Sequence, residues 1–360
     1  MPPLPNEARN SDLAYQAEVL QGVSRTFALT IPELPDPLRA VVGNAYLLCR
    51  ITDTIEDDPA LSAGQKQKLW RRFVDVLANR DDPRDFAREL GRMLSASTTA
   101  SEHDLVANTP RVVRITNGFS AAQRGALERC VRHMAHGMQE FQRLDTSAGL
   151  ASLMQLERYC YFVAGVVGEM LTELFCDYSV EMNDRRGELL PLAVSFGQGL
   201  QMTNILKDVW EDRRRGACWL PREVFRETGF DLSFLRPGQN HPGFARGLAE
   251  IVAIARQHLA DGMRYIELVP TRETGIRRHC LWALGMAVLT LRRVHATPMF
   301  KSGRDVKISR RSVSAVIAVT SLLGRSNVAL RQVFGTLTRG LPLPRASRSG
   351  EPERKSFDAG

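Results

Sequence analysis

The sequence predicts an all-α protein, and three observations support this fold class. Apolar residues recur at intervals of three and four, for example from Leu38 to Leu48 and from Leu153 to Val163, which is the spacing of helices with one buried face. Strand-like alternation bounded by turns is scarce. Proline and glycine fall where helices would end or begin, as at Asp58-Pro59, Asp82-Pro83 and Pro242-Gly243.

The chain is expected to form one large domain. It has 360 residues, of which 44% are hydrophobic and 24% charged, as in an ordinary soluble globular protein. The polar stretch Ser95 to Ser101 is short enough to be a loop. We expect residues 1–10, which contain three prolines, and residues 341–360, rich in Pro, Ser, Arg and Gly, to be disordered. The helical domain then covers residues 11–340.

The net charge of +8 indicates anionic partners, such as diphosphates or anionic lipid surfaces, or Arg-rich helices that simply face solvent. No run of basic residues is interleaved with aromatic ones, so we expect no nucleic-acid binding. The six cysteines form no CxxC pair and are predicted to be buried thiols in a reducing compartment.

Nothing in the sequence predicts a signal peptide or a membrane span. The N-terminal ten residues lack an apolar core. The longest uncharged run, Leu189 to Leu206, contains Pro191 and several polar residues, which makes it a poor span. We therefore expect a cytoplasmic protein.

Two carboxylate motifs suggest the chemistry. They are Asp53-Thr54-Ile55-Glu56-Asp57 and Asp208-Val209-Trp210-Glu211-Asp212. On a helix, the first and last aspartates of each motif lie one turn apart on one face, where like charges destabilise a bare helix. A divalent cation relieves this repulsion, and Mg²⁺ takes a few carboxylates together with waters and phosphate oxygens. Two such helices facing each other would hold Mg²⁺ over a diphosphate leaving group.

Acidic clusters are also common on solvated helix faces, so one motif alone would be weak support for a metal site. In a chain of this composition, the order Asp-x-x-Glu-Asp is expected by chance roughly 0.06 times, and two copies roughly 0.002 times. The pair therefore favours a metal-dependent enzyme acting on diphosphates over a charged surface.

Further polar residues fit a diphosphate site but have simpler explanations. Ser24-Arg25 joins a hydroxyl to a guanidinium, which suits diphosphate oxygens, although a helix cap followed by a surface arginine explains the same pair. Gln201, Asn204 and Asp208 fall on one helical face and need partners if they are buried.

The apolar run from Tyr159 to Gly168 is expected to be a helix that a neighbouring helix or a long ligand approaches closely, because Gly165 and Gly168 share a face. A plain core helix explains the same run. His133 and His136 have metal-ligand spacing but no evident third ligand, so they are expected to be ordinary surface or core residues.

Together, these residues resemble the squalene/phytoene synthase family of head-to-head prenyl transferases. The similarity extends from about Leu20 to about Thr338, and its strongest parts are Ser24 to Phe27, Tyr46 to Asp58, Tyr159 to Gly168, and Gln201 to Pro221. The resemblance implies an isoprenoid synthase fold, in which a single helical domain surrounds a central cavity.

The resemblance also implies roles for matching residues. Tyr46 and Tyr159 match active-site tyrosines, with Tyr159 as the proton-transfer or cation-stabilising group. Diphosphate-binding positions are matched by Ser24, Arg25, Arg50, Gln201 and Asn204. The implied Mg²⁺ ligands, whose aspartates are also catalytic, are Asp53, Glu56, Asp57, Asn204, Asp208 and Asp212.

Some segments resemble the squalene synthase branch of the family and others the phytoene synthase branch. Tyr159 to Gly168 resembles squalene synthases, and so does Phe300 to Ile308, which is similar to their stretch linked to NADPH; Lys307, Arg310 and Asn204 are the implied NADPH contacts. Arg214-Arg215-Gly216 followed by Trp219-Leu220-Pro221 is closer to the phytoene branch.

Three positions depart from the family pattern. Ala217 stands where both branches usually carry an arginine, a loss for which Arg213, Arg214 or Arg215 could compensate. Ser309 replaces a basic residue of the cofactor segment, and the surroundings of His279-Cys280 lack the phenylalanines of eukaryotic squalene synthases. We also expect no membrane anchor of the eukaryotic kind.

The implied activity is that of a squalene synthase, which condenses two farnesyl diphosphates through presqualene diphosphate and reduces the product with NADPH. Alternatives are a phytoene or dehydrosqualene synthase that needs no NADPH, and an enzyme that stops at presqualene diphosphate or hydroxysqualene. A non-catalytic alternative is a basic helical protein that docks on membranes. We expect a monomer. The basic and apolar stretch Ile308 to Arg339 suits peripheral contact with membranes, whereas its apolar residues also suit a helix that closes the active-site cavity; membrane binding through its arginines is compatible with both roles.

Overall fold

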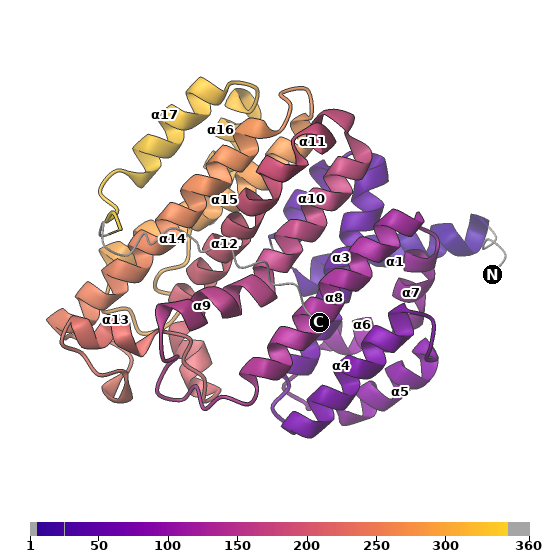
Figure 1. The fold of residues 1–360 in the computed structure, drawn as a ribbon, viewed down its shortest axis with the longest axis horizontal. Coiled ribbons are helices and arrows are strands. Elements are labelled where there is room, and N and C mark those ends of the chain that lie inside the picture. Colours follow the sequence, from indigo (N-terminus) through magenta and orange to yellow (C-terminus); the bar gives the residue numbers. More distant parts are fainter. Residues whose placement is uncertain (1–5, 25, 345–360) are drawn as a thin grey trace.

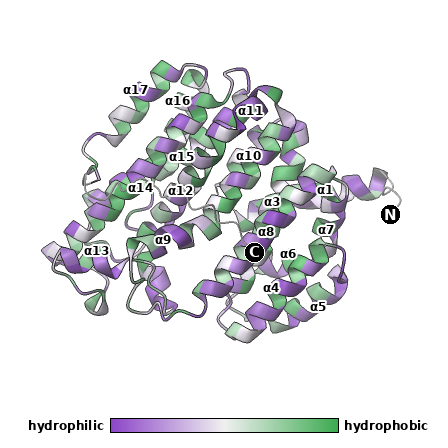
Figure 2. Cartoon of the chain, in the orientation of Figure 1, coloured by the Kyte–Doolittle hydropathy of each residue, from purple (hydrophilic) through white to green (hydrophobic). Residues whose placement is uncertain are grey.

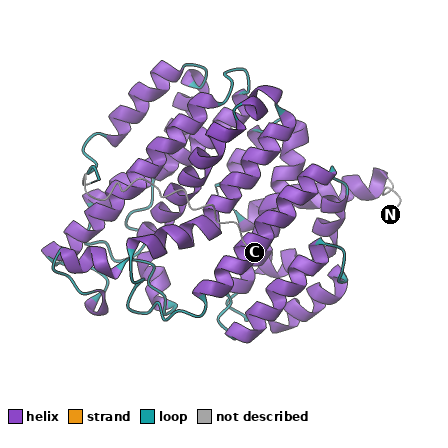
Figure 3. Ribbon diagram, viewed as in Figure 1, coloured by secondary structure: helices purple, strands orange, loops and turns teal. Residues whose placement is uncertain are grey.

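The computed structural model describes residues 6–24 and 26–344. All regular elements in these ranges are helical, and β-type pairing there is limited to one isolated bridge between Leu150 and Pro221 (Figure 3). The all-α prediction is therefore confirmed. The α-helices are α1 (Asn6–Val23), α2 (Phe27–Thr30), α3 (Asp36–Asp57), α4 (Ala63–Leu77), α5 (Pro83–Met93), α6 (Ala100–Ala107), α7 (Thr109–Asn117), α8 (Ala121–Phe141), α9 (Leu153–Cys160), α10 (Val166–Tyr178), α11 (Val180–Asp184), α12 (Arg186–Arg214), α13 (Arg222–Glu227), α14 (Pro242–Leu268), α15 (Thr274–Ala296), α16 (Arg310–Leu323) and α17 (Asn327–Thr338).

Three short elements complete the described chain. Two are 3₁₀ helices, η1 (Ile31–Glu33) and η3 (Leu232–Phe234), and the third is a π-helix, η2 (Tyr161–Gly165), which joins α9 to α10. π-helical turns inside longer helices are uncommon and are often found at functional sites. This one begins two residues after Tyr159.

Several helix boundaries predicted from proline are confirmed. Pro83 and Pro242 are the first residues of α5 and α14, where the missing N–H would have had no partner in any case. Pro270 and Pro298 follow the ends of α14 and α15. These breakers divide the chain into helices at the expected places.

One hydrophobic core extends through the described residues, from Val19 to Leu341. Helix α12 lies at its centre and packs against α10, α14 and α15, while α8 links α10 to α3 and α4 (Figure 1). Apolar and polar residues alternate around most helices, so each turns one face inward (Figure 2). All six cysteines are buried and free, as predicted.

The α10–α12 crossing depends on glycine. A Cβ atom on Gly168 would lie 2.3 Å from the carbonyl oxygen of Ala193, and one on Gly197 would lie 2.3 Å from that of Ala164. The two backbones therefore touch, which only glycine permits. Of the two partners predicted for the glycine face, the neighbouring helix is present.

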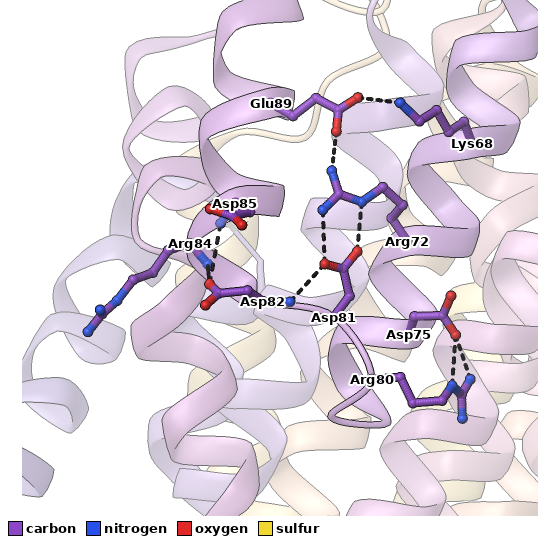
Figure 4. Close-up of polar contacts among 9 residues, drawn as sticks. All are labelled: Lys68, Arg72, Asp75, Arg80, Asp81, Asp82, Arg84, Asp85 and Glu89. Carbon is purple, nitrogen blue, oxygen red and sulfur yellow. Dashed lines mark hydrogen bonds and ion pairs between the residues drawn. The ribbon is translucent and has the colours of Figure 1, made fainter.

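A charged network joins α4 to α5 on the side of the molecule formed by the N-terminal half of the chain (Figure 4). Arg72 donates to both carboxylate oxygens of Asp81 at 2.7 and 2.9 Å and also pairs with Glu89. Asp82 caps α5 by accepting from the backbone N–H of Arg84 at 2.6 Å. Such bidentate pairs fix the angle between the two helices.

A buried arginine fastens the last helices to the body. Arg277 is fully buried in α15, and its guanidinium donates to the carbonyl oxygens of Gly324, Ile266 and Val269 at 2.6, 2.7 and 2.7 Å. It also donates to Asn327 Oδ1 at 2.6 Å. The turn between α16 and α17 is thereby held against the end of α14.

The chain ends are only partly described. Helix α1 begins at Asn6, inside the expected terminal segment 1–10, and residues 1–5 and 345–360 lie outside the described residues, so the two disordered ends stay predictions. Leu341 is buried, and Arg256 donates to its carbonyl oxygen at 2.9 Å. The helical run Leu153–Tyr178 is long and apolar enough to span a membrane, but 56% of its most apolar window is buried in the protein.

Candidate active site

The first carboxylate motif ends helix α3, whose site-facing residues are spaced four, three and four apart. They are Tyr46, Arg50, Asp53 and Asp57, and this spacing places them on one helical face. Asp58 belongs to the scaffold. Its carboxylate accepts from the backbone N–H groups of Ala60 and Ser95 at 2.8 and 2.7 Å and from the Thr98 hydroxyl at 2.7 Å, which fixes the end of α3.

The second motif lies in the last turns of α12. Gln201, Asn204, Asp208 and Asp212 share one face of this helix, as predicted; Asn204 is exposed and the other three are partly buried. The side chains of Val209 and Trp210 point into the core instead. Lys207 lies 2.8 Å from Asp208 and neutralises part of its charge.

The two motifs face each other. Arg215, just past the end of α12, forms an ion pair of 3.3 Å with Asp57 of the first motif. Burial raises the pKa of Asp212 to about 7, and the charges of Asp208 and Asp57 act in the same direction. Burial likewise raises the pKa of Asp53 to about 7, reinforced by Asp57. The carboxylates of α3 and α12 therefore share one electrostatic environment.

These residues fit a divalent cation. One carboxylate oxygen of Glu56 is buried without a hydrogen-bond partner, and burial raises the pKa of this residue well above its usual value. Within the described residues, no three His, Cys, Asp or Glu side chains form a ready-made metal cage. Mg²⁺ needs only one or two carboxylates, with waters and phosphate oxygens completing its shell. A surplus of poorly neutralised carboxylates is the donor set that such an ion requires.

The predicted diphosphate-binding residues beside α3 are held in place. Arg50 pairs with Glu102 of α6, a buried acid that positions the guanidinium beside Asp53. The Tyr46 hydroxyl donates to the carbonyl oxygen of Val23 at 3.0 Å, next to Ser24. Ser24 Oγ accepts from the Phe27 N–H, at the start of α2, at 2.9 Å. Arg25 lies outside the described residues.

Tyr159 forms an aromatic cluster with Trp219 and Phe141, close to both motifs. Its ring stacks on Trp219 at 3.9 Å with an angle of 8° between the planes, and Phe141 contacts it edge-on at 5.1 Å. Burial raises its pKa well above the usual value, and the charges of Glu56, Asp212 and Asp57 add to this effect. The phenol therefore lies close to carboxylates of both helices and stays protonated at neutral pH.

The loop between α15 and α16 covers part of the second motif. The backbone N–H of Gly303 donates to both carboxylate oxygens of Glu211 at 3.3 Å, and a Cβ atom on Gly303 would lie 3.0 Å from Asp208 Oδ1. Phe300 and Val306 are buried and anchor the loop. Lys307 and Arg310 are exposed beside it, without a contact to the carboxylates among the described residues.

Sequence reasoning missed several residues of this site. Glu102, Trp219 and Gly303 were not assigned to the site. Trp219 and Gly303 lie in segments that carry the family resemblance, but their contacts join them to Tyr159 and Glu211, and Glu102 reaches Arg50 from another helix. Of the arginines weighed as substitutes at Ala217, only Arg215 contacts a motif carboxylate across the site, whereas Arg213 donates to the carbonyl oxygens of Ser147 and Leu235. His133 and His136 are exposed on α8, as expected of ordinary surface residues.

A family model described as squalene/phytoene synthase matches residues 20–312 of this chain. A squalene synthase from Botryococcus braunii is 30% identical over 288 residues, which are 79% of this chain and 58% of that protein. A squalene synthase from Cyberlindnera jadinii is 28% identical over 331 residues, which are 89% of this chain and 70% of that protein. The chain thus spans little more than half the length of the Botryococcus relative.

Solved structures agree with the fold. A ligand complex of TcSQS superposes with a TM-score of 0.75 at 25% identity and covers 95% of this chain and 94% of its own. A dehydrosqualene synthase bound to a ligand has a TM-score of 0.65 at 19% identity, covering 89% of this chain and 99% of its own, and shows the shared fold alone. The predicted isoprenoid synthase fold is confirmed.

Proposed function

The chain belongs to the squalene/phytoene synthase family, and from that premise we propose that it joins two farnesyl diphosphates head to head and forms squalene. The observation that supports this most is the pair of carboxylate motifs that face each other beside Tyr159. An allylic diphosphate needs concentrated positive charge at its leaving group and a dry, apolar space for its carbocation. The two motifs suit the leaving group, and the aromatic cluster around Tyr159 suits the carbocation.

Six residues are proposed to hold Mg²⁺, namely Asp53, Glu56, Asp57, Asn204, Asp208 and Asp212. When bound, Mg²⁺ would neutralise the charge that develops on the departing diphosphate. The chain's own cations assist at the same place: Arg50, which Glu102 holds in position, together with Ser24, Arg25 and Gln201, is proposed to bind diphosphate oxygens.

The reaction requires the cleavage of two carbon–oxygen bonds, one in each diphosphate departure. The carbon–oxygen bond of one farnesyl diphosphate breaks and its electrons leave with the diphosphate. A double bond of the second molecule attacks the allylic cation, and loss of a proton closes the cyclopropane ring of presqualene diphosphate. Its diphosphate then departs, the carbon skeleton rearranges, and a hydride completes squalene. The stacked rings of Tyr159 and Trp219 keep water from these cations.

Each tyrosine has a proposed role that follows from its environment. The phenol of Tyr159 remains protonated because its pKa is raised by burial and by nearby carboxylates, so it donates a hydrogen bond to a diphosphate oxygen or stabilises the cation. Burial also raises the pKa of Tyr46, and its hydrogen bond to the Val23 carbonyl oxygen holds the ring at the end of α1. Tyr46 thus shapes the wall of the site.

We propose NADPH as the hydride donor. Lys307 and Arg310 would bind it from the loop that lies on the second motif, with Asn204 on the facing side of α12. NADPH, when bound, supplies the hydride that ends the sequence. The exposed basic side chains suit its phosphate groups.

The product distinguishes the alternatives. Phytoene and dehydrosqualene synthases end in proton loss without NADPH, and another variant stops at presqualene diphosphate or hydroxysqualene; the segment Arg214-Arg215-Gly216 keeps the phytoene branch open. The test is incubation with farnesyl or geranylgeranyl diphosphate and Mg²⁺, with and without NADPH, followed by mass analysis. Squalene formed only with NADPH supports the proposal. A product that does not change with NADPH overturns it in favour of the second branch.

We further propose a cytoplasmic monomer that docks on membranes through α16 and the start of α17. Val316 of α16 packs over Gly285 of α15, while Leu322 and Val328 are 82% and 64% exposed. Arg311 and Arg325 are exposed at the two ends of this face. A basic and apolar face suits an anionic bilayer, into which a C30 hydrocarbon can be released. Absence of salt-sensitive sedimentation with anionic vesicles would exclude this docking.

A further inference from the structure

Three consecutive arginines lie at the end of α12, the last of them just past the helix, and each contacts a different partner. Arg213 donates to two backbone carbonyl oxygens, and Arg214 donates to Glu211 on its own helix at 3.0 Å. Arg215 instead reaches Asp57, at the end of α3, with its Nη1 3.3 Å from Asp57 Oδ1. Among the described ion pairs, this is the one that joins the first carboxylate motif to the helix of the second.

The position of Arg215 follows from the helical repeat. Asp208, Asp212 and Arg215 are spaced four and three residues apart, so Arg215 continues the carboxylate face of α12. The backbone N–H of Arg215 donates to the carbonyl oxygens of Asp212 and Glu211 at 2.9 and 3.3 Å, which extends the turn by one residue. Its guanidinium is therefore directed into the space between the motifs.

The ion pair between Arg215 and Asp57 is exposed and can be replaced by other contacts. The side chains of Arg215 and Asp57 are 61% and 50% exposed, and one hydrogen bond connects them. Exposed pairs of this kind contribute little to stability and form and break readily. By contrast, the pair between Arg50 and Glu102 lies largely buried.

We propose that Arg215 is an exchangeable cation: it occupies Asp57 in the ligand-free protein, yields this carboxylate to a divalent metal, and then binds the diphosphate that accompanies the metal. This role for Arg215 rests on the proposed diphosphate chemistry of the site. Arg215 and the metal compete for Asp57, because a carboxylate oxygen that accepts from a guanidinium is not free to bind an ion. Once Asp57 binds the metal, the guanidinium remains near Asp212, whose pKa is raised by burial and lowered in part by this charge. There it faces the incoming diphosphate oxygens.

Two binding measurements with opposite expected signs test this inference. The variant is Arg215→Gln. Binding of Mn²⁺ alone is measured by electron paramagnetic resonance. Binding of inorganic pyrophosphate in the presence of saturating Mg²⁺ is measured by calorimetry. Without its competitor, Mn²⁺ should bind about two- to fivefold more tightly. Pyrophosphate should bind about ten- to a hundredfold more weakly, because a charge-assisted contact is lost.

Arg214→Gln is the matched control, since Arg214 has the same charge and similar exposure but contacts Glu211; it should change neither affinity. Arg215→Lys should recover part of the pyrophosphate affinity, and unchanged thermal unfolding establishes that the variants are folded. If both affinities fall, or neither changes, the inference is wrong. Neither probe carries a prenyl chain. The two binding results therefore do not depend on whether the protein converts farnesyl diphosphate into squalene.

Discussion

Asp53→Asn should make the ligand-free protein more stable at pH 8 while it removes most of the activity. Burial raises the pKa of Asp53 from its ordinary value of 3.8 to about 7; Asp57 and Glu102 reinforce the shift and Arg50 opposes it. The folded state therefore holds a proton between pH 4 and 7 that the unfolded chain has lost. Stability accordingly falls as pH rises through this window and stays lower above pH 7.

The size of the effect can be worked from the same shift. Each unit of pKa corresponds to about 1.4 kcal/mol, so a shift of about three units sets an upper limit of about 4 kcal/mol. Because the side chain is partly exposed, we discount this to about 2 kcal/mol. For a chain of this size, that is a rise of about 3 °C in Tm at pH 8. Turnover should fall about 10²- to 10³-fold, because a charge-stabilising group is lost.

Thermal unfolding at pH 5 and pH 8 without metal is the assay. The wild type should lose stability between these values, whereas Asp53→Asn should lose less. Asp58→Asn is the matched control, since this neighbouring carboxylate has the opposite environment: burial acts to raise its pKa, but hydrogen bonds from Thr98 and Ser95 outweigh this and lower it. It should be destabilised at pH 8. An Asp53→Asn variant less stable than the wild type at pH 8 would refute the reasoning.

Three further predictions concern other parts of the site and its frame. Arg277→Met should lower the free energy of unfolding in urea by about 3–5 kcal/mol, since three buried acceptors and one partly buried acceptor lose their donor; a loss below 1 kcal/mol would contradict this. Trp219→Leu should raise the share of water-quenched alcohol products, and Trp219→Phe should not, because an aromatic ring still stacks on Tyr159; equal product ratios would speak against shielding. Gly303→Val should displace the loop from Asp208 and reduce NADPH-dependent product more than diphosphate release; equal losses in both assays would separate the loop from the reduction.

The placement of each pair of aspartates on one helical face could be predicted from the sequence, because it depends on spacing within single helices. Asp53 and Asp57 share a face, as do Asp208 and Asp212, whatever the helices pack against. The boundaries at Pro83 and Pro242 are equally local, because proline lacks an N–H and fits only the first turn. The family resemblance uses the same short segments.

Which of these segments contact each other could not be predicted from spacing within one helix. Arg50 meets Glu102 across 52 positions, and Gly303 meets Glu211 across 92. Helical periodicity states which face of a helix is buried but not which helix covers it. The choice among Arg213, Arg214 and Arg215 likewise needed the end of α3 in place.

By itself, the sequence determined the all-α class, most helix boundaries and the two carboxylate faces, because backbone hydrogen bonding and side-chain spacing act over a few residues. Only the tertiary structure decided that the two faces meet beside Tyr159, that Trp219 supports its ring, and that a glycine loop lies on the second motif. These contacts arise from side-chain packing between distant segments, and the closeness of several carboxylates in one poorly hydrated space is what raises their pKa values.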